Sequence, residues 1–420
     1  MKFGFYIILA AQFFSSLADN ALLVAAIALL VQAQSPDWLT PMLKLFFTVS
    51  YVAVAPFVGA FADALPKGHV MFITNTIKIA GCVMMLTGVN PLLAYGIVGL
   101  GAAAYSPAKY GILTEYLPHR KLVIANGWME GLTVLSIILG TVLGGVLISN
   151  TTATWLLTLR PPYSAARIDT APQIAIVIIT VIYIIAAIIN LYIPRTGVDH
   201  RIPHKNPYYL VRDFAHCIKL LWSDRLGQIS LATTTLFWGA GATLQFIVLK
   251  WAQDALGYTL SQATMLQGIV AVGVAGGALA AARLVPLTRA VRVIPVGVAM
   301  GIIVMVMVFV RNAGVAMALM VVIGGLSGFL VVPMNALLQH RGHILMGAGH
   351  SIAVQNFNEN ISILAMLGLY SLFIALDFSI DTVIVLFGLF VAVAMVLVRK
   401  RHQFNERNRP LPTLPAELPH

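Results

Sequence analysis

Twelve long apolar segments constrain the fold of this chain more than any other feature. They cover approximately residues 5–31, 41–62, 70–88, 91–115, 121–149, 172–193, 226–251, 260–282, 290–310, 314–338, 345–375 and 380–398. A helix needs about 20 apolar residues to cross a bilayer, and within lipid only helices and closed barrels satisfy all backbone polar groups. Continuous apolar runs of this length exclude barrel strands, in which apolar and polar residues alternate. The pattern therefore predicts an all-α integral membrane protein with twelve transmembrane helices.

The composition leaves little room for a soluble domain. Of the 420 residues, 59% are hydrophobic and 10% are charged, whereas about 25% are charged in soluble domains. The two cysteines, Cys82 and Cys217, are too few for a disulfide framework or a cysteine-rich metal site. The chain has no P-loop sequence, no G-x-S-x-G nucleophile motif and no acyltransferase-type H-x-x-x-x-D motif. We therefore expect that the chain is not an enzyme and that it binds no metal ion or other cofactor.

The distribution of basic residues predicts the orientation of the chain. The net charge is +11, and nineteen of the 26 Lys and Arg residues fall in the termini and loops on one side of the predicted spans. The loops on the other side contain Arg160, Arg167 and Arg311. Because cytoplasmic loops of membrane proteins are enriched in Lys and Arg, both termini are expected in the cytoplasm. The same bias accounts for the positive charge without a nucleic-acid partner.

The longest of the cytoplasmic loops separates the first six spans from the last six. The expected organisation is an N-terminal six-helix bundle over 1–193, a cytoplasmic linker over 194–225, a C-terminal six-helix bundle over 226–398 and a cytoplasmic tail over 399–420. Within the linker, residues 208–222 are expected to form a short amphipathic helix on the membrane surface. Two six-helix repeats of parallel topology are the organisation of the major facilitator superfamily.

Polar and ionisable residues form stripes on several predicted spans. Such groups are costly in lipid and mark partners, watery cavities or function, and residues spaced by three, four or seven share one helix face. The stripes are Gln12, Ser15, Ser16 and Asp19 in the first span; Ser106, Lys109 and Tyr110 in the fourth; Asn126, Glu130 and Thr133 in the fifth; Thr235, Trp238 and Gln245 in the seventh, with Lys250 near its outer end; and Gln355, Asn356, Glu359 and Ser362 in the eleventh. We expect these stripes to face an amphipathic chamber between the two bundles.

Four charged residues in these stripes are the central candidates for function. Asp19, Lys109, Glu130 and Glu359 are expected to hold a polar or zwitterionic headgroup and to form alternating salt bridges between the two halves. The alternative is that they form static pairs that only hold helices together. Lys78, in the third span, is expected to snorkel to the membrane surface or to form a structural pair.

Further polar residues lie at the ends of spans. Asp63 follows Gly59 by one helical turn at the end of the second span. It is expected to cap a helix N-terminus or to bind a loop base, and Asp63 and Lys67 are the candidate gating residues. His340 and His343 are expected to be solvated in a loop between the tenth and eleventh spans.

Sequence motifs in both halves of the chain match one family of transporters. They are Ala18-Asp19-Asn20, Tyr105-Ser106-Pro107-Ala108-Lys109-Tyr110-Gly111, Ala125-Asn126-Gly127, Leu236-Phe237-Trp238-Gly239, Val332-Pro333-Met334-Asn335 and Ala353-Val354-Gln355-Asn356. In these motifs the chain resembles the bacterial lysophospholipid transporters of the major facilitator superfamily. The resemblance implies a monomer in the bacterial inner membrane that moves lysophosphatidylethanolamine and lysophosphatidylglycerol from the outer to the inner leaflet. A separate cytoplasmic acyltransferase–acyl-carrier-protein synthetase would then re-acylate them.

The resemblance also implies a mechanism and a set of site residues. It implies alternating access with lateral entry of the lipid, and the seams between spans 5 and 8 and between spans 2 and 11 are the candidate gates. The candidate substrate-binding and salt-bridge residues are Asp19, Asn20, Lys109, Glu130, Gln245, Lys250, Gln355, Asn356 and Glu359. The family pattern has an arginine where this chain has Gln245, so either Lys250 replaces it or its salt bridge with Asp19 is lost. Span 8 contains small residues that favour close helix contacts, namely Gly268, Gly273, Gly276 and Gly277.

Two other functions are compatible with the same residues. A proton-coupled exporter of drugs or other amphiphiles would use Asp19 and Glu359 to carry protons as well as to bind amines. A membrane scaffold that recruits the acyltransferase without transport is the other alternative, but buried charges on several helices bring no benefit to a scaffold.

Overall fold

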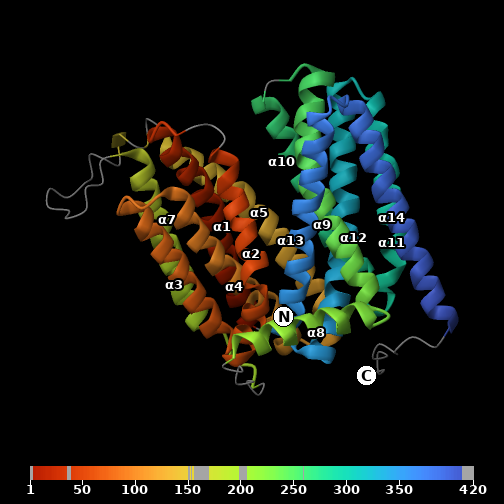
Figure 1. The fold of residues 1–420 in the computed structure, drawn as a ribbon, viewed down its shortest axis with the longest axis horizontal. Helices are drawn as coiled ribbons and strands as arrows, with labels where there is room; N and C mark the ends of the chain where they lie inside the picture. The colour runs from red at the N-terminus through yellow and green to blue at the C-terminus, as the bar shows by residue number, and fades with distance from the viewer. Residues whose placement is uncertain are drawn as a thin grey trace. The chain divides into compact units, whose positions relative to one another are not determined.

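The computed structural model describes residues 3–35, 39–149, 152, 154–155, 170–197, 206–258 and 260–408. These residues form helices and no strand (Figure 1). The helices that coincide with the predicted spans are α1 (Phe3–Gln32), α2 (Leu39–Ala64), α3 (Lys67–Leu86), α4 (Pro91–Tyr116), α5 (Leu122–Ile148), α7 (Ala171–Leu191), α9 (Gly227–Leu256), α10 (Leu260–Leu284), α11 (Ile294–Val306), α12 (Ala313–Met346), α13 (Ala348–Ala375) and α14 (Ile380–Asn408). Further described elements are η1 (His119–Lys121), α8 (Pro207–Ser223), η2 (Leu287–Val293) and η3 (Met307–Phe309). The all-α fold predicted from hydropathy is confirmed.

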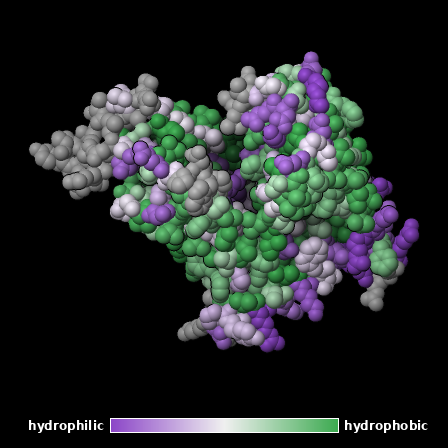
Figure 2. Space-filling view, turned by 45° about the horizontal axis from the view of Figure 1, so that its top comes forward, coloured by the Kyte–Doolittle hydropathy of each residue, from purple (hydrophilic) through white to green (hydrophobic). Residues whose placement is uncertain are grey.

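The helices have the length and surface of membrane spans. Eleven helical stretches in the described part of the chain are long and apolar enough to cross a membrane. The helix α4 is not among these eleven. It has 26 residues and matches the predicted fourth span, but its glycine, tyrosine, serine and proline residues lower its mean hydropathy. Figure 2 shows apolar side chains over the sides of the helices in view and polar side chains near the helix ends. The chain is therefore a multi-pass membrane protein.

The linker contains the short helix that its sequence predicts. The helix α8 covers the segment 208–222. Its Phe214 and Leu221 side chains are buried, whereas Tyr208 is exposed. The prediction of an amphipathic helix is confirmed, and its placement on the membrane surface stays a prediction.

Two helix ends differ from the predicted ones. Only Gly347 separates α12 from α13, and its φ of 98° is a conformation that favours glycine. His340 and His343 therefore lie within α12 and not in a solvated loop, and His340 is buried. The helix α14 continues to Asn408, so the beginning of the predicted tail is helical, and residues 409–420 lie outside the described residues. Hydropathy predicts where lipid contact ends, whereas the helix itself continues until its backbone bonds are interrupted.

The helices form two compact units. Unit 1 consists of Met1–Ile112, Leu135–Phe214 and Ala348–Ala353, and unit 2 consists of Leu113–Val134, Ala215–Gly347 and Val354–His420. Each unit thus contains most of one predicted bundle and a short segment from the other half of the chain. The first half of α5 packs in unit 2, and the first turns of α13 pack in unit 1. The predicted bundle limits at residues 193 and 226 stay predictions.

In unit 1, the helix α7 packs against both α1 and α3, and the three helices lie side by side in Figure 1. Their common core includes Leu22, Cys82, Ile179 and Tyr183. Lipid tails are as apolar as these side chains, so close packing and polar contacts hold the helices together.

In unit 2, the helices α10 and α12 approach each other at the level of their backbones. A Cβ atom at Gly277 would overlap the carbonyl oxygen of Gly325, and one at Gly273 would also overlap the α12 backbone. A Cβ atom at Gly268 or Gly276 would have no neighbour within 4 Å. Only two of the four glycines noted in span 8 therefore make this close contact.

We expect Gly277→Ala to lower the free energy of unfolding by about 1–3 kcal/mol, the usual cost of overpacking. The clash is with a backbone oxygen, which has less freedom to move aside than a side chain. The matched control is Gly276→Ala, where the new methyl group meets open space. Equilibrium unfolding in detergent measures the free energy of unfolding of both purified variants. Equal values for Gly277→Ala and Gly276→Ala would show that the α10–α12 contact is not tight.

Candidate functional site

Asp19 lies in a buried ion pair in unit 1. Lys78 Nζ on α3 donates to Asp19 Oδ1 at 2.8 Å and to Asp19 Oδ2 at 2.9 Å. The Tyr183 hydroxyl on α7 donates to Asp19 Oδ1 at 2.6 Å. Lys78 Nζ also donates to Ser15 Oγ at 3.1 Å, and Ser15 in turn donates to Asn75 Oδ1 at 2.8 Å. This Asp19–Lys78 network joins α1, α3 and α7 through charged hydrogen bonds.

The pair is largely withdrawn from solvent. The Lys78 side chain is 1% exposed and the Asp19 side chain is 22% exposed. Lys78 Nζ also lies 4.8 Å from the centroid of the Tyr105 ring and 5.6 Å from that of the Tyr183 ring, where the negative faces of the rings attract a cation. Lys78 is thus the cation that faces Asp19, and it comes from the third span.

The other unit 1 candidates make separate contacts. The Asn20 side chain donates to the carbonyl of Ser16 in its own helix at 2.8 Å. Lys109 on α4 is buried, and its Nζ lies 4.7 Å from the centroid of the Tyr110 ring.

The two candidate glutamates belong to one amide-linked network in unit 2. Asn335 on α12 donates to Glu130 Oε1 at 3.2 Å. Gln355 Nε2 on α13 donates to Asn335 Oδ1 at 3.0 Å and to Glu359 Oε1 at 2.7 Å. Glu130 and Glu359 are only 4% and 7% exposed. Two buried carboxylates are therefore held on α5 and α13 by two amides between them. We refer to Glu130, Asn335, Gln355 and Glu359 as the glutamate–amide network.

Further polar contacts attach the first half of α5 and the preceding turn to α12. The amide groups of Asn126 and Gln339 donate to each other at 2.9 Å in both directions. His119 Nδ1 in η1 lies 3.0 Å from His340 Nδ1. Gly127 allows the close approach of α10, because a Cβ atom there would lie 2.6 Å from Ala282 Cβ. At this end, the seam between the predicted spans 5 and 8 is tightly packed.

The remaining candidates in unit 2 make exposed or incomplete contacts. Gln245 Nε2 donates to Gln267 Oε1 at 3.0 Å. Lys250 pairs with Asp254 in its own helix at 3.1 Å, with side chains 49% and 41% exposed. The Asn356 Nδ2 atom is buried and has no hydrogen-bond partner among the described residues.

Asp63 caps the beginning of α13 within unit 1. Its Oδ1 atom accepts hydrogen bonds from Lys67 Nζ and from the backbone N–H of Gly349, both at 2.8 Å. Its Oδ2 atom accepts from the backbone N–H of His350 at 3.2 Å and lies 2.7 Å from His350 Nδ1. A carboxylate at a helix N-terminus is favoured because the first backbone N–H groups lack partners within the helix. We refer to this set of contacts as the Asp63 clamp.

Gly59 makes room for the Asp63 clamp. A Cβ atom at Gly59 would lie 2.9 Å from His350 Cα, so a larger residue would push α13 away from α2. His350 Nε2 also lies 3.5 Å from Asp213 Oδ2 on α8. The clamp therefore joins α2, α3, α8 and the first turns of α13 within unit 1.

Several of these partners were not identified from sequence. Asn335 and Gln339 occur near the end of span 10 and His350 at the start of span 11, but nothing in their spacing indicates which acid or amide they meet. Lys78 had the clearest signal, because a lysine within a span needs an anion nearby.

Among the described residues, no group of three or more His, Cys, Asp and Glu side chains is placed to hold a metal ion.

Comparison with known proteins places the chain among transporters. Residues 8–366 match the family model of the Major Facilitator Superfamily. Proteins named "Lysophospholipid transporter LplT" from Yersinia pestis (strain Pestoides F) and Yersinia pseudotuberculosis serotype O:3 (strain YPIII) are each 44% identical over 370 residues, which are 88% of this chain and 86% of theirs.

Solved structures share the fold at low sequence identity. The human organic anion transporter MFSD10 has a TM-score of 0.72 at 13% identity, and the match covers 96% of this chain and 100% of that one. A bacterial homologue of the iron transporter ferroportin has a TM-score of 0.71 at 13% identity, with 97% and 100% covered. At this identity the likeness concerns the fold alone.

Proposed function

The chain belongs to the major facilitator superfamily and, within it, to the family of the lysophospholipid transporter LplT, and on this premise we propose that it transports lysophospholipids. The observation that carries the proposal is the 44% identity over 88% of the chain to proteins of that name. The members of this family are transporters and not enzymes, and we propose the same for this chain.

We propose a flippase in the bacterial inner membrane, with both termini in the cytoplasm. It moves lysophosphatidylethanolamine and lysophosphatidylglycerol from the outer to the inner leaflet, where a separate acyltransferase–acyl-carrier-protein synthetase re-acylates them. The transporter acts as a monomer by alternating access. The acyl chain gains about 0.8 kcal/mol per buried CH₂, so the lipid enters sideways between helices and its tail stays in an apolar environment.

The glutamate–amide network suits a headgroup that carries an amine. Glu130 and Glu359 provide two carboxylates in a buried setting, and a protonated ethanolamine group is attracted by such charges. Lys109 is the corresponding candidate for the phosphate. Asn20, Gln245, Lys250, Gln355 and Asn356 remain candidates for polar contacts along the route.

The Asp63 clamp is proposed to act as a gate together with the α5–α10 contact. Each contains a close helix contact at a glycine, Gly59 in unit 1 and Gly127 in unit 2. Opening of the Asp63 clamp requires the carboxylate of Asp63 to leave the α13 N-terminus. The Asp63–Lys67 pair has side chains 9% and 2% exposed, so breaking the contact and hydrating both charges accompanies each cycle.

A lipid conversion assay in spheroplasts tests the function. Spheroplasts that lack an endogenous transporter receive lysophosphatidylethanolamine in the outer leaflet, and its conversion to the diacyl lipid is followed with and without this protein. Conversion that depends on the protein and persists with an uncoupler supports the flippase. Absence of conversion above background overturns it, and proton-linked export of amphiphilic cations becomes the next function to test.

We expect Glu359→Gln to reduce lysophosphatidylethanolamine conversion at least tenfold while the protein stays folded. Glutamine keeps an oxygen that can accept from Gln355 but removes the negative charge. A tenfold change corresponds to about 1.4 kcal/mol of lost interaction. Glu406→Gln, an acid that is 51% exposed on α14, is the control. Normal conversion by Glu359→Gln at equal expression would make Glu359 a structural residue only.

A further inference from the structure

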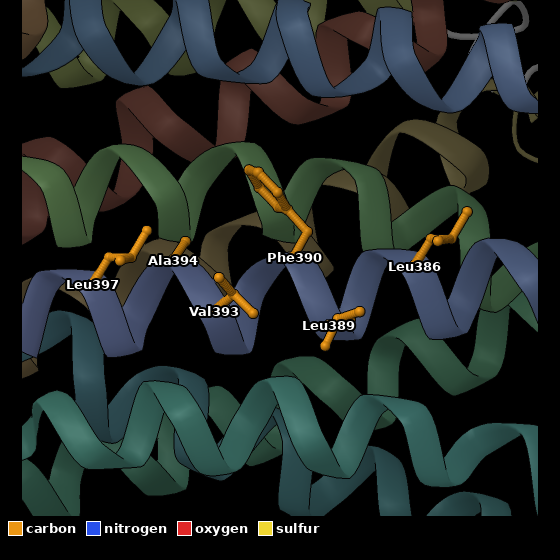
Figure 3. Close-up of a pocket in the computed structure, with 6 residues that line it drawn as sticks. All are labelled: Leu386, Leu389, Phe390, Val393, Ala394 and Leu397. Carbon is orange, nitrogen blue, oxygen red and sulfur yellow. The ribbon is translucent and has the colours of Figure 1, made fainter.

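The helix α14 has an apolar groove along one face. The groove has a volume of about 320 Å³ and is lined by Leu386, Leu389, Phe390, Val393, Ala394 and Leu397 (Figure 3). Leu389, Phe390 and Val393 are 49%, 48% and 49% exposed, so the groove is open to the surroundings of unit 2. Its lining is apolar throughout and belongs to a membrane span, which suits an acyl chain.

Basic residues follow the groove on the same side of α14. Lys400, Arg401 and Phe404 follow Leu397 by three, four and seven residues and therefore share its side of the helix. At 1.5 Å per residue, Lys400 lies about 4.5 Å beyond Leu397 along the helix axis. All three side chains are exposed. Two cations thus lie directly beyond the end of an apolar groove.

No carboxylate among the described residues forms an ion pair with these two cations. Arg401 Nε donates to the uncharged Gln228 Oε1 at 3.0 Å, and its guanidinium lies 5.5 Å from the centroid of the Phe404 ring. The acid at this end of α14 is Glu406, which lies 3.4 Å from His402 Nε2. Glu406 is five residues from Arg401 and so points to another side of the helix.

We propose that this face binds an anionic phospholipid, with one acyl chain in the groove and the phosphate at Lys400 and Arg401. Clusters of Lys and Arg next to a membrane span attract anionic headgroups. A second copy of the chain would bring two such positive faces together, and a free phosphate would leave the groove unused. Arg401 also contacts Gln228 near the start of α9, so the bound lipid stabilises the packing of α14 against α9. The site is independent of the proposed transport route.

Lipid titration of the purified full-length protein in detergent tests the proposal. The midpoint of thermal unfolding is measured against dioleoylphosphatidylglycerol, with dioleoylphosphatidylcholine and glycerol 3-phosphate as separate arms. The anionic lipid is expected to raise the midpoint in a saturable way, because a ligand that binds the folded state stabilises it. The neutral lipid should have a much smaller effect, and glycerol 3-phosphate should have none.

Three variants locate the site. Lys400→Gln/Arg401→Gln should need about 25-fold more phosphatidylglycerol for half of the effect, because each cation near an anionic surface contributes about fivefold. Val393→Trp fills the groove and should weaken binding although both cations remain. Arg399→Gln removes an exposed cation two residues from Leu397, on the opposite side of the helix, and should match the wild type.

Equal weakening in Arg399→Gln would show general electrostatic attraction and overturn the proposal. An equal response to glycerol 3-phosphate would show a free phosphate site, and an equal response to phosphatidylcholine would show ordinary contact with neutral lipid. Either result overturns the proposal. If the double variant does not fold, Val393→Trp and Lys400→Glu test the site instead. Wild-type affinity for phosphatidylglycerol in both of these variants would overturn the proposal. Because none of these measurements involves transport, their outcome is distinct from that of the spheroplast assay.

Discussion

Replacing Lys78 by methionine is expected to lower the free energy of unfolding by about 3–5 kcal/mol, the cost of leaving one charge of a buried pair without its partner. In wild type, the Lys78 ammonium satisfies both oxygens of Asp19. After Lys78→Met, the Asp19 carboxylate retains the Tyr183 hydroxyl at 2.6 Å but loses the cation. Asp19→Asn should cost a similar amount, because it leaves the ammonium with Ser15 and two aromatic rings. Equilibrium unfolding in detergent measures both losses.

The double variant Asp19→Asn/Lys78→Met distinguishes charge from packing. With no lone charge left in the core, it should be more stable than either single variant, because uncharged replacements avoid the desolvation of an ion. The control is Lys250→Met, whose pair with Asp254 is about half exposed and whose loss should cost less than about 1 kcal/mol. If Lys78→Met were no more damaging than Lys250→Met, the Asp19–Lys78 network would not hold unit 1 together.

Asp63→Asn is expected to reduce lysophospholipid conversion at least tenfold. The carboxylate of Asp63 accepts hydrogen bonds from Lys67 and from two backbone N–H groups at the start of α13. Asparagine has nearly the same size but no charge, so it removes the carboxylate to which Lys67 Nζ donates at 2.8 Å and weakens the cap of α13. The state in which the Asp63 clamp is formed then loses population, and each 1.4 kcal/mol lost is a factor of ten. The spheroplast assay, normalised to folded protein in the membrane, measures the effect.

The control for Asp63→Asn is Asp381→Asn, which removes the acid of a partly exposed ion pair. Asp381 lies 3.4 Å from Arg311, with side chains 42% and 52% exposed, and Asp381→Asn should leave conversion within a factor of two. Adding Lys67→Met to Asp63→Asn removes the buried ammonium that has lost the Asp63 carboxylate and should recover part of the lost stability. Full conversion by Asp63→Asn would mean that the Asp63 clamp forms no part of the transport cycle.

Much of the architecture follows from local sequence. Each predicted span coincides with a described helix because a run of apolar residues in lipid has no way to satisfy its backbone other than by helix formation. The helix α8 was equally predictable, since its apolar residues recur with helical spacing. The ends of α12 and α14 were not, because a helix extends beyond the lipid when nothing interrupts its hydrogen bonds. Gly347 is such an interruption between α12 and α13, but a glycine is compatible with both helix and turn.

The candidate site shows the same division. The sequence identified Asp19, Glu130 and Glu359 as polar residues that need an explanation within spans. It did not identify Lys78 as the cation for Asp19, since the two lie 59 residues apart. Nor did it predict that Asn335 and Gln355 link the two glutamates. Such partners depend on which helices are neighbours and on their rotation about their axes, which hydropathy does not report.

The sequence by itself determined that this chain spans the membrane with helices, which of its residues are too polar for lipid, and to which transporter family it belongs. These properties depend on residue type and spacing along one segment, where the physics is local. Only the tertiary structure decided that Lys78 neutralises Asp19, that Asp63 caps α13 and that the first half of α5 packs in unit 2. Each of these is a contact between segments far apart in the chain, and its energy exists only once packing has brought the two partners to within hydrogen-bond distance.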